Sequence, residues 1–168
     1  MPVDDNPQSM ADTVRWRLVG GLCVCLLLAG CLGAVTSPDD SDYEWTTVTA
    51  VDGETGDELA AVEVRIADNR SLRYTGLSDT DSLGENEGML FVHDSEGTPG
   101  YVMRDMGFPI DMVFIDSTGE ITTIHHADVD DDETFRGTAQ YVLEVPYHYT
   151  TDNEIDVGDR IEIPDEYQ

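Results

Sequence analysis

The sequence predicts a mainly β fold (α+β with little helix), a small single-domain sheet-rich barrel or sandwich. Short apolar or alternating runs recur along the second half of the 168-residue chain. Clusters of Gly, Pro, Asp, Ser and Thr, which favour turns, separate these runs. Short strands joined by tight turns bury their apolar faces by packing sheet on sheet or by closing a barrel, and this predicts the fold class.

The individual elements follow from the local pattern. Residues 62–66 alternate apolar and charged side chains, as a half-buried strand does, and residues 69–77 are compatible with one or two helical turns. Further strands are expected at 88–93, 101–106, 110–115, 120–125, 140–145 and 157–163. The turn sequence Asp116-Ser117-Thr118-Gly119 predicts a hairpin between the third and fourth of these.

The chain is expected to divide into a signal peptide at 1–30, an acidic flexible tether at 31–61 and a globular domain at 62–164. Arg15 and Arg17 precede an apolar stretch, residues 18–30, that suits a signal peptide and is too short to span a bilayer. The stretch ends in Leu28-Ala29-Gly30-Cys31, which resembles the lipobox of lipoprotein precursors.

Cys31 is therefore the predicted lipidation site and the predicted mature N-terminus. The protein is expected to be exported and anchored to the outer face of the cell membrane through two lipid chains, which hold a protein stably where one chain does not. An uncleaved N-terminal anchor and a secreted product are the alternatives. No cysteine follows Cys31, so the domain has no disulfide, no thiol nucleophile and no cysteine-based zinc site.

The composition is extremely acidic. The chain has 36 Asp and Glu residues against 8 basic residues, all of them Arg, and a formal net charge of -28. Nucleic-acid binding is not expected, because affinity for a phosphate backbone requires Lys and Arg that release its counterions. Since molar salt would screen the self-repulsion of so many carboxylates, the protein is predicted to be halophilic.

Four sequence blocks occur in a characteristic order. They are Arg73-Tyr74-Thr75-Gly76-Leu77, Gly88-Met89-Leu90-Phe91, the segment from Tyr101 to Asp116, and the segment from Tyr141 to Pro146 followed by Gly158-Asp159. In the third block, the matching residues are Met103, Arg104, Pro109, Ile110, Asp111, Phe114, Ile115 and Asp116. Together the blocks resemble the family called domain of unknown function 192, here as a haloarchaeal-type lipoprotein.

The resemblance covers roughly residues 62–163 and implies a single sheet-rich domain, often exported, without implying an activity. The chain departs from the family pattern at three places. Val102 stands where the family usually has Trp, Asp105-Met106 replaces an Asn-Thr pair, and Tyr147-His148 replaces an Ala-Gly turn.

Five residues are candidates for a ligand site: Arg73, Met103, Arg104, Asp111 and Glu144. Both arginines fall in the blocks above, and each is expected to pair with Asp111 or Glu144. A carboxylate among apolar strand residues must be solvated, paired or functional. The competing interpretation is a structural network that fixes the fold.

No metal site and no cofactor is predicted. The acidic run at 128–133 fails the EF-hand spacing, because Glu133 stands where the Gly is needed and Ala139 where the bidentate Glu is needed. A solvated acidic loop is expected there. His125 and His126 are adjacent, so a strand would point them to opposite faces.

The leading functional hypothesis is a lipid-anchored binding or accessory module for a small molecule or glycan. The sequence does not decide whether the chain is an enzyme, although no recognised catalytic motif is present. The first alternative is a small hydrolase or carbohydrate-acting enzyme that uses Asp111 or Glu144. The second alternative is a structural protein of the cell envelope.

Overall fold

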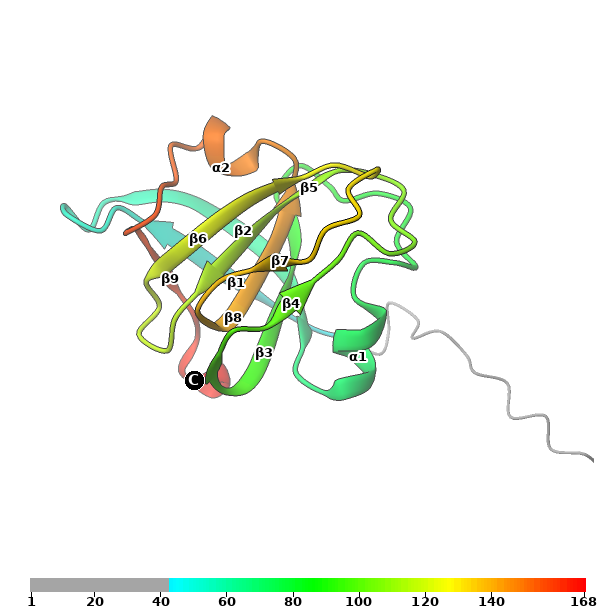
Figure 1. Ribbon diagram of the computed structural model, residues 1–168. Coiled ribbons are helices and arrows are strands. Elements are labelled where there is room, and N and C mark those ends of the chain that lie inside the picture. Colours follow the sequence, from blue (N-terminus) through cyan, green and yellow to red (C-terminus); the bar gives the residue numbers. More distant parts are fainter. Residues whose placement is uncertain (1–42) are drawn as a thin grey trace, which may run out of the picture. The chain divides into compact units, whose positions relative to one another are not determined.

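The computed structural model describes residues 43–168. The fold is mainly β, with 46% strand and 10% helix, and this confirms the predicted fold class. A curled seven-stranded sheet resembles half a barrel, and two short strands form a second sheet (Figure 1). The predicted signal peptide, Cys31 and the first part of the predicted tether lie outside the described residues.

The large sheet runs in the order β6-β5-β8-β3-β2-β1-β9. Its strands are β1 (Glu44–Val51), β2 (Glu58–Ala67), β3 (Glu87–Gly97), β5 (Ile110–Ile115), β6 (Ile121–Ala127), β8 (Ala139–Pro146) and β9 (Arg160–Glu162). All neighbours pair antiparallel except β2 and β3, which are parallel. The small sheet pairs β4 (Gly100–Tyr101) with β7 (Phe135–Arg136).

Three short helices complete the described part: α1 (Arg70–Thr75), α2 (Tyr149–Asp152) and a 3-10 helix at Asp165–Tyr167. Asn69 caps α1, since its side-chain oxygen accepts hydrogen bonds from the backbone N–H groups of Ser71 and Leu72. Gly76 ends the helix with a φ of 53°, a conformation that glycine adopts without strain. No helix in residues 43–168 is long and apolar enough to cross a membrane.

The curl of the sheet brings its two edges together at one end. Ile121, at the start of β6, donates its N–H to the carbonyl of Asp159 at 2.8 Å, and Ile161 of β9 donates to the carbonyl of Gly119 at 2.8 Å. These bonds satisfy backbone groups that an open edge would leave unpaired.

The β5–β6 hairpin has the predicted turn. Its strands pair from Ile110 opposite Ala127 to Ile115 opposite Ile121. Within the turn, Oδ1 of Asp116 accepts hydrogen bonds from the N–H groups of Thr118 and Glu120 at 2.8 and 2.9 Å. This is the local bonding that makes aspartate a turn former.

Two of the predicted boundaries need correction. The globular domain begins before residue 62, because β1 pairs with β2 from Glu44 opposite Ile66 to Val51 opposite Glu58 and buries Val48 completely. Residues 44–61 therefore form β1, the turn that follows it and the start of β2, rather than a tether. The strand expected at 101–106 ends at Tyr101, and Asp105 has a φ of 59°, which is incompatible with a strand.

The sheet is buried on both faces. One face carries a core that includes Val64, Val113, Leu143 and Ile161. This core extends to both edge strands, β6 and β9. The other face carries a second core that includes Met89, Phe91, Phe114 and Val142, which α1 and the β4–β7 pair cover together with residues 102–108 (Figure 1). Because successive side chains of a strand point to opposite faces, neighbouring residues of one strand belong to different cores.

Candidate functional site

A pocket of about 380 Å³ opens between α1 and the second face of the sheet. We call it the α1 pocket. It is lined by residues 73–78, Phe91 and His93 of β3, residues 99–102, Arg104, Met106, Ile110 and Glu144. The lining is apolar for the most part, with a few convergent polar side chains, which is the usual character of a small-molecule site.

Glu144 lies on β8, between β5 and β3 in the sheet, and faces this pocket. Its register opposite Met89 and Met112 places it on the second face, and only 5% of its surface is exposed. Its carboxyl group makes no hydrogen bond to another group within residues 43–168. Burial raises the pKa of Glu144 to about 8, so the group is mostly uncharged at neutral pH.

His93 and Tyr101 form a polar pair beside Glu144. The Nε2 atom of His93 and the hydroxyl oxygen of Tyr101 are 3.0 Å apart, a hydrogen bond whose direction depends on the histidine tautomer. Burial, and then the nearby charge of Arg73, lowers the pKa of His93. Burial, and then the charge of Glu144, raises the pKa of Tyr101. All three groups are therefore expected to be uncharged at neutral pH.

Two arginines line the same pocket. Nη1 of Arg73 donates to the backbone carbonyls of Asp68 and Val92, which ties the end of α1 to β3. Nη2 of Arg104 donates to the carbonyl of Tyr74 at 2.7 Å, and the guanidinium lies 4.3 Å from the centre of the Tyr74 ring. The expected pairing of these arginines with Asp111 or Glu144 is not formed.

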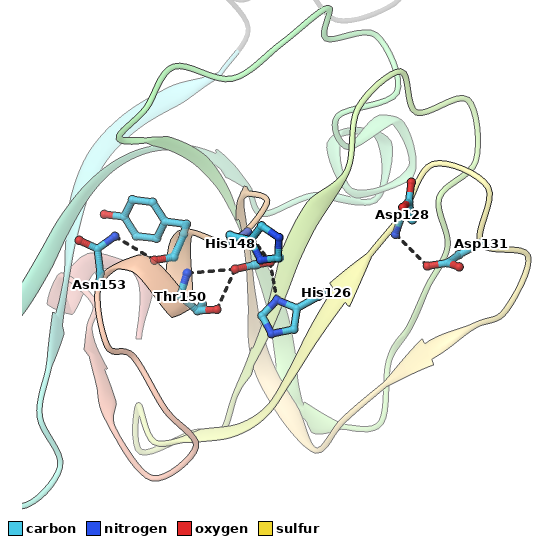
Figure 2. A network of polar contacts seen from close by, with 8 residues as sticks. His126, Asp128, Asp131, His148, Thr150 and Asn153 are labelled. Carbon is cyan, nitrogen blue, oxygen red and sulfur yellow. Dashed lines mark hydrogen bonds and ion pairs between the residues drawn. The ribbon is translucent and has the colours of Figure 1, made fainter.

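Asp111 lies on the opposite face of the sheet from Glu144. It is fully buried and accepts four hydrogen bonds: from Nδ1 of His126 at 2.7 Å, from the N–H of His148 at 3.1 Å, and from the N–H and Oγ1 of Thr150 at 2.9 and 2.7 Å. In Figure 2, His126, His148 and Thr150 lie close together, and dashed lines mark the hydrogen bonds of this network. The network holds the turn into α2 against β5 and β6.

His148 occupies a conformation that favours glycine. Its φ is 66°, at the position where the Ala-Gly turn of the family pattern has its glycine. A left-handed non-glycine residue costs about 1 kcal/mol or more, which surrounding contacts must offset. The hydrogen bond from its N–H to Asp111 is one such contact.

The five predicted residues are thus divided between two places. Arg73, Arg104 and Glu144 share the α1 pocket, Asp111 anchors the α2 turn, and Met103 is buried in the second core with 5% exposure. Because Asp111 and Glu144 face opposite sides of the sheet, they cannot flank one scissile bond, as a two-carboxylate hydrolase requires.

The acidic loop at 128–133 is bonded internally. Oδ2 of Asp131 accepts the N–H of Asp128 at 2.8 Å, which is also drawn in Figure 2. No group of three or more His, Cys, Asp or Glu side chains in residues 43–168 is arranged to hold a metal ion. His125 and His126 point to different partners, the carbonyl of Arg136 and the carboxylate of Asp111.

His93 and Tyr101 were not among the predicted site residues. A usable signal was present for His93, because it stands two residues after Phe91 on the same strand and so shares its face. Tyr101 opens the third sequence block, but its segment resembles a strand until the turn at Asp105 is known.

Comparison with known proteins identifies similar sequences and structures. The sequence model of the family DUF192, described as "Uncharacterized ACR, COG1430", matches residues 51–163. The match begins in β1, earlier than the resemblance noted from the sequence blocks. No curated protein matches the chain.

Two crystal structures share the fold. A candidate transcription regulator from Sinorhizobium meliloti 1021 is 28% identical, with a TM-score of 0.67, and the match covers 71% of this chain and 94% of that chain. A protein of unknown function from Novosphingobium aromaticivorans DSM 12444 is 22% identical, with a TM-score of 0.68, and the match covers 76% and 91% of the two chains.

Proposed function

The chain belongs to the DUF192 family, and we propose that its domain is a binding module that holds a small molecule in the α1 pocket. The observation that carries this proposal is Glu144, a carboxyl group that is 5% exposed, faces the pocket and has no hydrogen-bond partner within residues 43–168. The carboxyl oxygens are not fully enclosed and open onto the pocket. A ligand in the pocket that hydrogen-bonds to Glu144 would lower the cost of keeping this carboxyl group largely out of water.

The rim of the pocket supports the same proposal. Tyr74 and Val102 line it and are 72% and 48% exposed, and they are two of the four large hydrophobic residues that are exposed in the described part of the chain. Exposed apolar side chains beside a concave site are typical of ligand or partner contacts. The ligand is therefore expected to have an apolar portion as well as polar groups.

A catalytic role has less support. Of the two carboxylates considered for a hydrolase, Asp111 lies on the face of the sheet away from the α1 pocket, and the imidazole of His93 beside Glu144 is already bonded to Tyr101. Transcription regulation is named for the Sinorhizobium protein, but a chain with no lysine and a net charge of -28 is poorly suited to a phosphate backbone. A binding module remains the proposal that the charges and the pocket support together.

A thermal-shift screen in molar KCl tests this function. The compounds are small polar molecules and short sugars, tested against the wild type, Arg104→Ala and the control Arg160→Ala. Arg160 is matched because it also donates to a backbone carbonyl, that of Thr118 at 2.6 Å, and does not line the α1 pocket. A true ligand is expected to raise the melting temperature of the wild type and of the control, and to raise that of Arg104→Ala less. Equal stabilisation of all three would place the ligand elsewhere.

We also propose that this module is anchored to the outer face of the cell membrane through a lipid on Cys31. The support is the apolar stretch at 18–30 and the Leu28-Ala29-Gly30-Cys31 sequence that ends it. Cys31→Ser is expected to move the protein from the membrane fraction to the soluble or secreted fraction. Unchanged retention in membranes after this substitution would exclude the lipid anchor, and Cys25→Ser serves as the control.

A further inference from the structure

We infer that the α1 pocket selects small organic anions, and specifically molecules with a carboxylate group and an apolar body. The inference rests on the proposed function, since it names the class of ligand that the pocket would take. Its basis is the contrast between the charge of the pocket and the charge of the rest of the domain.

The pocket is a cationic hollow in an acidic protein. The part of the chain after Cys31 has six arginines, and two of them, Arg73 and Arg104, line this one pocket. Its lining includes a single acidic residue, Glu144, although the chain has 36 Asp and Glu residues. Because Glu144 is buried and mostly uncharged at neutral pH, no ionised carboxylate lines the pocket, and the acidic partner of Arg104 is Asp105, an exposed side chain outside the lining.

Both guanidinium groups keep hydrogen-bond donors for a ligand. A guanidinium has five N–H donors, and within residues 43–168 the Arg73 group uses only Nη1. Arg104 uses Nη2 for the carbonyl of Tyr74 and its Nε forms an exposed ion pair with Asp105 at 3.6 Å, so within residues 43–168 its Nη1 group is left for a ligand. Free N–H groups in a planar fork match the two oxygens of a carboxylate.

The uncharged Glu144 favours an anion over a cation. An ionised carboxylate at this position would attract a cation and repel an anion, whereas a protonated one does neither and offers an O–H donor to the ligand. Tyr101 lies beside it with its hydroxyl group also protonated. The polar groups of the pocket are therefore rich in donors, which suits a ligand with acceptor oxygens.

The apolar walls distinguish an organic carboxylate from an inorganic anion. Phe91, Met106 and Ile110 line the pocket, and a bare phosphate would leave these surfaces in contact with water. A volume of about 380 Å³ accommodates a ring or a short chain as well as the charged group. Partly buried charges are also screened less by salt than exposed ones, so recognition by charge survives in a saline medium.

Three molecules of the same shape and different charge test this inference: benzoate, benzamide and benzamidine, an anion, a neutral compound and a cation. Each is added at 10 mM to the wild type in molar KCl at pH 7, and the melting temperature is measured. Benzoate is expected to raise it by at least about 2 °C, benzamide by less, and benzamidine not at all. In Arg104→Gln the benzoate shift is expected to fall by more than half, while Arg160→Gln keeps it.

The outcomes separate the ligand class from the binding function. If benzamide or benzamidine stabilises the wild type as well as benzoate does, and Arg104→Gln reduces that shift, the pocket binds ligands but does not select anions. If benzoate stabilises wild type and Arg104→Gln equally, or stabilises neither, the carboxylate inference is wrong, and the broader compound screen decides the binding function. The comparison of the three probes on the wild type does not depend on how well any variant folds.

Discussion

Glu144→Gln is expected to remove a large part of the pH dependence of the domain's stability. Burial raises the pKa of Glu144 from 4.5 to about 8 in the folded protein. The folded state therefore holds this proton to a higher pH than the unfolded state does. The stabilising contribution of the protonated group is fully present below about pH 4.5 and is lost as the pH rises through about 8. Between pH 5 and pH 9 the wild type should lose about 4 kcal/mol relative to the variant.

Chemical denaturation in molar KCl at several pH values measures this difference. Glu63→Gln is the matched control, because Glu63 is exposed on the neighbouring part of the same sheet, and its pH dependence should follow that of the wild type. Parallel pH profiles for the wild type and Glu144→Gln would show that the Glu144 carboxyl is ionised or solvated in the folded protein. The proposal that Glu144 is uncharged in the α1 pocket would then be wrong as well.

Asp111→Asn is expected to lower the free energy of unfolding by about 3 kcal/mol or more. The two carboxylate oxygens of Asp111 each accept two hydrogen bonds in a fully buried position. An amide of the same shape replaces one of these oxygens with an NH₂ group. Whichever way the amide turns, that group faces a backbone N–H, that of His148 or that of Thr150, and leaves this buried donor unsatisfied, while the His126 ring or the Thr150 hydroxyl must reverse its role from donor to acceptor.

Thr150→Val resolves the contribution of one donor. It removes the Oγ1 hydrogen bond and leaves the other three, so a loss of about 1 kcal/mol is expected. Because both substitutions act on one network, the double variant should lose less than the sum of the two single losses. Asp128→Asn, in the exposed acidic loop, is the control and should change stability little. A loss below 1 kcal/mol for Asp111→Asn would contradict the structural role of the network.

The contrast between Asp111 and Glu144 explains why sequence reasoning combined them into one site. Both are carboxylates in apolar strands, and β5 and β8 carry buried apolar side chains on both of their faces. A strand buried on one face shows which side chains point inward, but a strand buried on both faces gives no such signal. The register of β5 against β8, which places Asp111 opposite Val145 and Met112 opposite Glu144, separates the two groups.

By itself the sequence determined the features that depend on neighbouring residues. The mainly β class, the β5–β6 hairpin with its Asp116 turn, the short helix within residues 69–77 and the acidic loop at 128–133 all follow from short stretches of side chains that bond or pack within a few positions. Interactions between residues close in the sequence stabilise these elements, so the sequence pattern alone is enough to predict them.

Only the tertiary structure decided how distant segments meet. The parallel pairing of β2 with β3, the inclusion of residues 44–61 in the sheet, and the gathering of Arg73, Arg104 and Glu144 around one pocket join positions far apart in the chain. These contacts are selected by the burial of two whole cores rather than by any local preference. The curl of the sheet therefore determines which buried side chains contact one another, and the local sequence pattern does not contain this information.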